Sequence, residues 1–343
     1  MTWHPLTWAF WVATVTGTVL YLSAGRRALQ ISLNWAPAAA DADQLHRERQ
    51  AEAAALLGRG AFLCLATAAL LGLTGIALVW HRTVPGAMCG TGVLQAMGAN
   101  GTRAAVFWTA TLLILYGWPT LDRLDSHHPR AVLTRQASRM MIVAAPFLTL
   151  GLYYAWQALM RIDVVPPVSC CAAVYDQVLG GPSRSLKAPI VTASLWVSLA
   201  GSAVVALTTL AALRFPTRAS GFMVSGAAFV WTVASVLAVK HVWAASYYQV
   251  LSHPCPWCLF LPHYYGAGFL IFGCLAVIAS ESVAVGLADH IRRRHTVLAA
   301  PATRRIRRAA WRIVIALTGF TVLTTGPAIA WRLRTGMWLH GAL

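Results

Sequence analysis

His253-Pro254-Cys255-Pro256-Trp257-Cys258 stands directly before an apolar run at 259–280. Two thiols separated by two residues can close a disulfide within one turn, and the amide groups at a helix start stabilise a thiolate. We expect this pair to open a transmembrane helix that has Pro262 in its first turn. A dithiol placed in this way is suited to disulfide exchange or electron transfer. The pair alone is equally compatible with a metal site or a structural bridge.

Similar apolar runs recur along the whole chain and set the fold class. Of 343 residues, 58% are hydrophobic and 11% are charged, which is unlike a soluble globular domain. Each run of roughly 20 residues is long enough to cross a bilayer, whereas barrel strands would alternate over shorter segments. The sequence predicts an all-α, polytopic membrane protein with about eight transmembrane helices. The expected spans are 4–24, 61–80, 104–121, 140–160, 190–213, 219–239, 259–280 and 311–331.

The distribution of Lys and Arg predicts the orientation of these spans. Of the 27 Lys and Arg residues, 19 fall in the alternate loops 25–60, 122–139, 214–218 and 281–312. Positively charged loops mark the cytoplasmic side. We therefore expect a bacterial inner (plasma) membrane protein with both termini on the periplasmic side. The net charge of +17 then reflects topology and attraction to anionic membrane lipid, and no nucleic-acid partner is expected.

The N-terminal part is expected to be a retained span followed by a polar helix. Two arginines follow the first span and none precedes it, which is the reverse of a cleaved signal peptide. In the cytoplasmic segment, Asp41 or Asp43 is placed to cap a helix that Gly58 would end.

Five of the seven cysteines fall on the expected outer side, where disulfides persist: Cys89, Cys170, Cys171, Cys255 and Cys258. Adjacent Cα atoms lie about 3.8 Å apart, so Cys170 and Cys171 do not easily bridge to each other. One of them can pair with Cys89, which leaves the other to exchange with Cys255 or Cys258. A static Cys89 bridge between two outer loops is the alternative. The two remaining cysteines lie within spans and are typical of buried small residues.

The two outer loops that carry these cysteines resemble each other. Placing Cys89 on Cys171 also aligns Gln95 with Gln177. The match predicts an internal repeat of two helical hairpins, each with an outer cysteine before a short amphipathic helix.

Polar and aromatic side chains surround the Cys pair: His253 before it and His263, Tyr264 and Tyr265 after it. At the outer edge of a span such groups can hydrogen-bond a quinone ring or a developing thiolate. They are also ordinary residues of an interfacial belt.

The residues around the pair also bear on two other kinds of site, a haem attachment and a zinc site. A c-type haem attachment needs His directly after the second Cys, and position 259 is Leu. A zinc site would draw on Cys255, Cys258, His253 and one loop Cys. Because Pro256 and Trp257 lie inside the pair and a bilayer span follows it, the redox interpretation is preferred and no metal site is assigned.

The stretch from about 140 to 280 resembles the vitamin K epoxide reductase (VKOR) family of membrane thiol oxidoreductases. Cys171-Ala172-Ala173-Val174 matches the Cys-x-x-Val of that family's outer loop, and Cys255-Pro256-Trp257-Cys258 matches its redox pair. The resemblance implies a four-helix bundle, to which this chain adds a similar hairpin. The family's second loop cysteine is missing, because position 165 is Val, so Cys170 or Cys89 would have to substitute.

The resemblance also implies an activity. Cys255 and Cys258 would reduce a bound quinone, and the loop thiols would take electrons from a periplasmic thioredoxin-like partner. The alternatives are a non-catalytic subunit of a larger membrane complex with structural disulfides, and an electron carrier that uses the outer histidines. The expected segments are 1–60 (first span and cytoplasmic segment), 61–139 (first Cys-loop hairpin), 140–280 (VKOR-like core) and 281–343 (basic cytoplasmic loop and last span).

Overall fold

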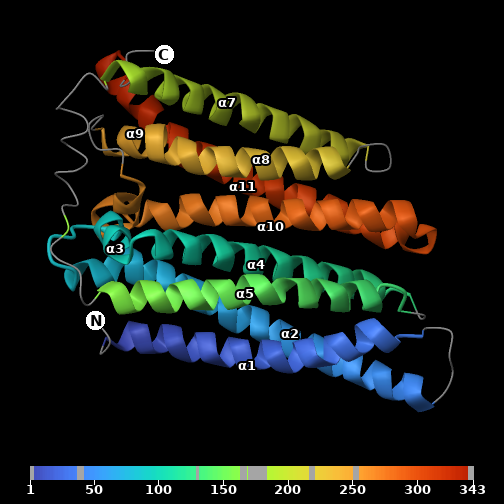
Figure 1. Cartoon of the computed structure of the whole chain (residues 1–343). Coiled ribbons are helices and arrows are strands. Elements are labelled where there is room, and N and C mark those ends of the chain that lie inside the picture. Colours follow the sequence, from blue (N-terminus) through green and yellow to red (C-terminus); the bar gives the residue numbers. More distant parts are fainter. Residues whose placement is uncertain are drawn as a thin grey trace. The chain divides into compact units, whose positions relative to one another are not determined.

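A computed structural model describes residues 4–36, 42–128, 131–162, 168, 184–215, 221–249 and 255–338. The described residues form helices and no strand, which confirms the all-α class (Figure 1). The long helices are α1 (Pro5–Asn34), α2 (Ala42–Thr74), α4 (Ala99–Asp125), α5 (Thr134–Ile162), α7 (Arg184–Arg214), α8 (Gly221–Ala238), α10 (Ala267–Arg294) and α11 (Ala299–Thr335). The short elements are η1 (Gly75–Val79), η2 (Trp80–Arg82), α3 (Gly90–Met97), η3 (Val239–Trp243), α9 (Ala244–Tyr248), η4 (Pro256–Phe260), η5 (Pro262–Tyr264) and η6 (Thr296–Leu298).

In the described part of the chain, eight helical segments are long and apolar enough to cross a membrane, and each predicted span overlaps one of them. Several segments extend beyond the apolar run that predicted them. The second, Ala42–Arg82, has 41 residues, whereas the apolar run covers 61–80. A helix satisfies its own backbone groups, so it can continue from lipid into water without a break. The chain is therefore a multi-pass membrane protein.

The prediction that Gly58 ends the cytoplasmic helix is wrong, because α2 continues through it. A Cβ at Gly58 would overlap Cε of Met141 and lie 2.9 Å from the Trp118 ring. Gly58 therefore serves close packing of α2 on α4 and α5, which outweighs the low helix propensity of glycine. Of the two proposed capping residues, Asp43 lies in the first turn of α2, and Asp41 is outside the described residues.

The described helices group into two compact units. Unit 1 comprises Met1–Thr83, Leu94–Val165 and Leu287–Arg304; unit 2 comprises Val84–Val93, Pro166–Gly286 and Arg305–Leu343. The grouping differs from the segments expected from the sequence. Helix α5 was expected to begin the 140–280 core, but it belongs to unit 1, and most of α11 joins α7, α8 and α10 in unit 2.

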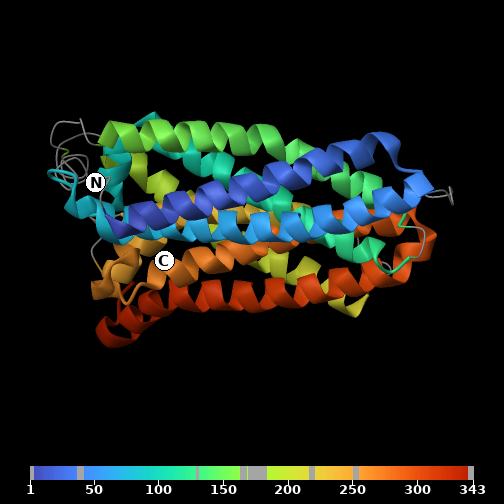
Figure 2. The same cartoon turned by 90° about the horizontal axis from the view of Figure 1, so that it is seen from below.

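Unit 1 is held by helix pairs that are joined by buried polar contacts. Helix α1 packs on α2 and on α5, and α4 packs on α5 (Figure 2). The Tyr21 hydroxyl of α1 donates to the Met141 carbonyl of α5 at 2.6 Å, and the Trp80 indole donates to the Thr7 hydroxyl at 3.1 Å. These hydrogen bonds fix the rotation of each helix, because a buried donor left unsatisfied in an apolar surrounding is costly.

Unit 2 uses the same principle around α8. The Trp231 indole donates to the Ser198 carbonyl of α7 at 3.0 Å, and its ring packs edge-on against Phe320 of α11 at a centroid distance of 5.1 Å. Trp243 of η3 donates to the Ser198 hydroxyl at 3.2 Å. The contacts of Trp231 and Trp243 thereby connect α7, α8 and α11.

The expected basic loop 281–312 is mostly helical, because α10 runs to Arg294 and α11 begins at Ala299. Buried carboxylates allow charged residues on these helices. Within unit 2, Glu281 of α10 is 2% exposed and accepts from Arg305 at 2.7 Å and from Arg312 at 2.6 Å, both in α11. These ion pairs connect α10 to α11 at the point in α10 where its apolar residues end.

Candidate functional site

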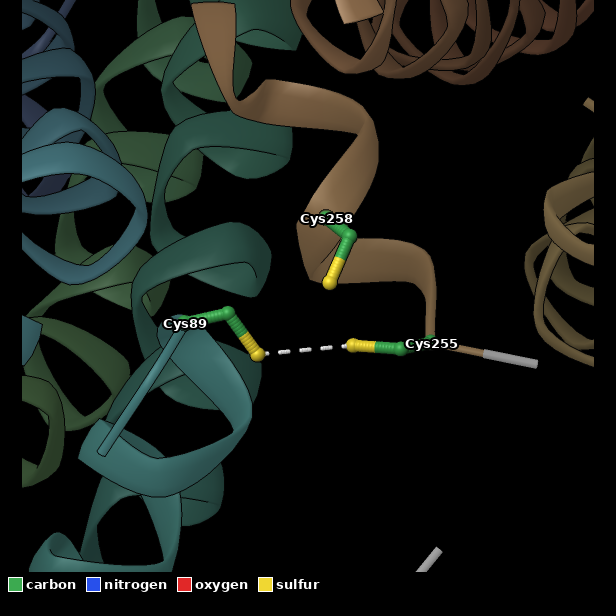
Figure 3. Close-up of side chains that lie close together, drawn as sticks. All are labelled: Cys89, Cys255 and Cys258. Carbon is green, nitrogen blue, oxygen red and sulfur yellow. Dashed lines mark hydrogen bonds between the residues drawn. The ribbon is translucent and has the colours of Figure 1, made fainter. Parts of the chain in front are cut away.

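The structure brings three predicted thiols together within unit 2 (Figure 3). Cys89 lies directly before α3, and Cys255 and Cys258 lie at η4. Their sulfur atoms all lie within 4.8 Å of one another, and those of Cys89 and Cys255 are 3.5 Å apart. The three residues are 2%, 4% and 8% exposed, respectively. The site is a buried group of three thiols, in hydrogen-bonding contact and without an S–S bond between Cys89 and Cys255, which would measure about 2.05 Å.

The position of the Cys pair differs from the prediction in one respect. The pair does not open α10, which begins at Ala267. Cys255 is extended and caps the 3-10 turn η4, and Pro262 lies in a second turn, η5. Tyr265 then takes a left-handed conformation with φ 55°, which ends that turn before α10. The dipole of a long helix therefore does not act on the pair, and its thiols depend on hydrogen bonds.

Both cysteine segments follow a helix that widens near its end. The π-helix η1 ends α2 before Cys89, and the π-helix η3 ends α8 before Cys255. A π-turn inserts an extra residue and redirects the chain, a feature that is frequent at functional sites. The predicted pairing of the Cys89 loop with the loop at 165–180 falls on residues that lie outside the described part, apart from Val168.

Aromatic side chains hold the Cys pair in place. The Tyr248 hydroxyl, at the end of α9, donates to the Cys255 carbonyl at 2.7 Å. The Tyr264 ring packs on Tyr248 at a centroid distance of 4.4 Å. Trp257, inside the pair, covers the backbone of Gly90, where a Cβ would lie 2.6 Å from the indole. Gly90 therefore allows the segment next to Cys89 to approach η4.

Hydrogen bonds concentrate negative charge on Cys255. The pKa of the Cys255 thiol lies well below its usual range because its sulfur is hydrogen-bonded to Cys258, to Cys89 and to the Thr91 hydroxyl, which is 3.1 Å away. Burial opposes this shift. The pKa of Cys258 is raised, because its proton is shared with Cys255 and because it is buried. Of the three thiols, Cys255 is therefore the one whose charged form the surrounding hydrogen bonds favour.

We expect the Cys255 thiolate to be alkylated well below the pH at which ordinary thiols react, near their pKa of about 8.5. Replacing Thr91 by Val removes one donor to the charged sulfur and is expected to move the midpoint of the pH profile upward by about one pH unit. The measurement is the iodoacetamide labelling rate of the Cys255 peptide against pH, by mass spectrometry. An unchanged midpoint in T91V would show that the hydroxyl does not act on Cys255.

Replacing Gly90 by Ala is expected to separate Cys89 from Cys255, because the added Cβ displaces the Trp257 ring. We expect the yield of Cys89–Cys255 disulfide after mild diamide oxidation to fall at least about fivefold, the loss that a shift costing about 1 kcal/mol produces. The matched control is Gly273→Ala in α10, where an added Cβ meets nothing within 4 Å. Equal yields in the two variants would contradict the proposed role of Gly90.

Among the other predicted site residues that the structure describes, none belongs to the group of three sulfurs. His263 is exposed and Tyr265 is 94% exposed, and Tyr264 reaches the site through Tyr248. Cys170, Cys171 and His253 lie outside the described residues. Sequence reasoning missed Thr91, Gly90 and the specific role of Tyr248. Their nearness in sequence to Cys89 or to the pair was the available signal.

The two cysteines inside spans are not part of the site. Cys64 and Cys274 are each partly buried, and Cys274 lies against Gly319 of α11, where a Cβ would be 3.3 Å from its sulfur. Both therefore serve as packing residues and as matched controls for the three clustered thiols.

Comparison of the chain with protein-family models, with curated proteins and with solved structures finds no match.

Proposed function

We propose that the protein is a membrane thiol–disulfide oxidoreductase that couples disulfide formation on the outer face to quinone reduction. The observation that carries this proposal is the group of three buried sulfurs within 4.8 Å. Thiol–disulfide exchange needs three sulfurs, one that attacks and two that share the bond under attack. The group formed by Cys89, Cys255 and Cys258 is the smallest set that can pass a disulfide from one partner to another.

The proposed chemistry uses Cys255 as the common member of two disulfides. When the pair is oxidised, the Cys89 thiolate can attack the Cys255 sulfur, which forms a Cys89–Cys255 disulfide and releases Cys258 as a thiol. An incoming dithiol then attacks the Cys89 sulfur, releases Cys255 and afterwards Cys89 as thiols, and leaves as a disulfide. The reduced pair passes two electrons and two protons to the quinone, which forms the Cys255–Cys258 disulfide again. Cys258 keeps its proton until the oxidation step, which agrees with its raised pKa.

A quinone is the proposed electron acceptor, because it takes up the two electrons and two protons that a dithiol releases. The aromatic residues around the pair support a flat, apolar ligand. Trp257 and Phe260 lie 5.5 Å apart between ring centroids, and Phe260 also packs on Phe272 at 5.4 Å. Of the residues predicted to bind the quinone, Tyr264 contributes a half-buried ring near the thiols, so it is the preferred candidate.

The resemblance of the Cys255-Pro256-Trp257-Cys258 motif to the VKOR family supports the same proposal. It also implies a periplasmic thioredoxin-like protein as the partner. The distribution of Lys and Arg supports a bacterial inner membrane location with both termini on the periplasmic side. The absence of Cys at position 165 is then compensated by Cys89, whose sulfur lies next to Cys255.

The test uses the purified full-length protein in lipid nanodiscs, with a reduced dithiol peptide and ubiquinone or menaquinone. We expect one quinol to form for each disulfide made in the peptide. Mass mapping of the quenched protein is expected to find a Cys255–Cys258 disulfide after quinone is added. If quinone leaves the thiols of this pair unchanged, the proposed function is wrong.

One observation favours a second function, that of a structural or assembly subunit in a larger membrane complex. Cys89, Cys255 and Cys258 are at most 8% exposed, which restricts direct attack by a protein partner. In this case the thiols would hold the outer segments together as a static bridge. The same mass map separates the two proposals, because a static bridge keeps one disulfide under both oxidising and quinol-reduced conditions.

A further inference from the structure

We propose that the reduced Cys89, Cys255 and Cys258 form a binding site for one divalent thiophilic ion of the zinc class. The inference concerns the same thiols as the proposed function, but it requires neither a quinone nor a turnover. It rests on the position of the three sulfurs and on the composition of the donor set.

The distances between the sulfurs are close to those of a metal site. A zinc–sulfur bond measures about 2.3 Å, so two sulfurs on one tetrahedral ion lie about 3.8 Å apart. The Cys89 and Cys255 sulfurs are 3.5 Å apart, and no pair among the three exceeds 4.8 Å. A decrease of about 1 Å in the widest separation would bring all three sulfurs to bonding distance of one ion.

The donor set selects the class of metal. The described residues bring three sulfurs together and no carboxylate or imidazole with them. Magnesium and calcium prefer oxygen ligands, whereas thiolates select zinc and related soft ions. Three protein ligands also leave one coordination position for water or an outer ligand, as in zinc sites that are not closed.

Charge favours a divalent ion over a monovalent one. Three thiolates in a buried site carry three negative charges, and charges that are buried without compensation are costly. A divalent ion lowers the total to one negative charge, while a monovalent ion leaves two. The Thr91 hydroxyl, 3.1 Å from the Cys255 sulfur, can donate to a metal-bound thiolate and offset part of the remainder.

Metal binding and disulfide formation exclude each other at this site, because an ion requires all three sulfurs as thiolates. The ion would therefore hold the protein in its reduced form. Zinc is expected to protect the three thiols from alkylation and from oxidation by diamide.

The experiment titrates Co²⁺ into the fully reduced, metal-free, full-length protein in nanodiscs, without quinone or any partner. We expect one Co²⁺ per chain, with a thiolate-to-cobalt charge-transfer band and the intense visible bands of four-coordinate cobalt. Zn²⁺ should displace it. We expect the affinity for Co²⁺ to fall in three variants, Cys89→Ser, Cys255→Ser and Cys258→Ser. Losing a residue that only hydrogen-bonds a metal ligand lowers affinity roughly 10–100-fold, and the loss of a ligand itself should exceed that.

The controls are Cys64→Ser and Cys274→Ser, which should bind Co²⁺ as the unchanged protein does. Absence of the charge-transfer band, or a band that survives in C89S and C258S, would overturn the inference. A Cys170→Ser/Cys171→Ser variant that abolishes the band while C89S keeps it would place the ion elsewhere and would also overturn it. Failure of metal binding with intact quinone-dependent oxidation refutes this inference alone. Intact metal binding without quinone-dependent oxidation refutes only the proposed function.

Discussion

Replacing Cys255 by Ser is expected to lower quinone-dependent disulfide formation at least about a thousandfold, toward the uncatalysed rate. Cys255 is the thiol whose charged form its neighbours favour, and its sulfur contacts both Cys89 and Cys258. A serine hydroxyl cannot form either disulfide. The loss should therefore appear in the rate of quinol formation and not in the amount of folded protein.

The neighbouring positions sharpen this prediction. Cys258→Ser keeps Cys255 but removes the second sulfur of the pair, so we expect no quinol, and a trapped Cys89–Cys255 disulfide once diamide is added as the oxidant. Cys274→Ser, which lies in α10 away from the cluster, should retain full activity. The measurement is quinol formation by absorbance, together with mass mapping of the trapped disulfide. Activity in C255S above a few per cent of the unchanged protein would remove Cys255 from the proposed mechanism.

Replacing Glu281 by Ala is expected to lower the free energy of unfolding by about 3–5 kcal/mol, the cost of breaking a buried ion pair by removing one partner. Glu281 is 2% exposed and receives two guanidinium groups from α11. The Arg305 side chain is 15% exposed, so its charge would lose its carboxylate in a poorly solvated position. The effect should appear as early loss of the α10–α11 contact.

The matched control is Arg312→Gln, because the Arg312 side chain is 56% exposed and water can replace its contact. We expect that change to cost about 1 kcal/mol or less. Both values are measured by thermal or denaturant unfolding of the protein in detergent, followed by tryptophan fluorescence. Equal losses in E281A and R312Q would show that burial of the carboxylate does not set the size of the effect.

The eight spans could be predicted from the sequence because the length of an apolar run is a local property and the bilayer sets the length required. Helix ends were harder to place. Gly58 reads as a stop signal, yet it lies in the middle of α2 because Trp118 and Met141 need the space that a side chain would occupy. The basic segment at 281–312 reads as a loop, yet it is mostly helical, and Glu281 of α10 pairs with Arg305 and Arg312 of α11. In both cases a contact between distant residues outweighed the local pattern.

By itself, the sequence determined that this is a helical, multi-pass membrane protein and that a Cys-x-x-Cys pair stands before its seventh span. The first fact follows from the composition and the second from the spacing of the cysteines. The tertiary structure alone decided which thiol meets the pair. Cys89, 166 residues away from Cys255 in sequence, is the described thiol that lies beside it. It also decided that the pair lies on a short 3-10 turn. Contacts of this kind depend on packing between segments that are distant in sequence. The apolar runs and the periodicity of a single segment do not specify them.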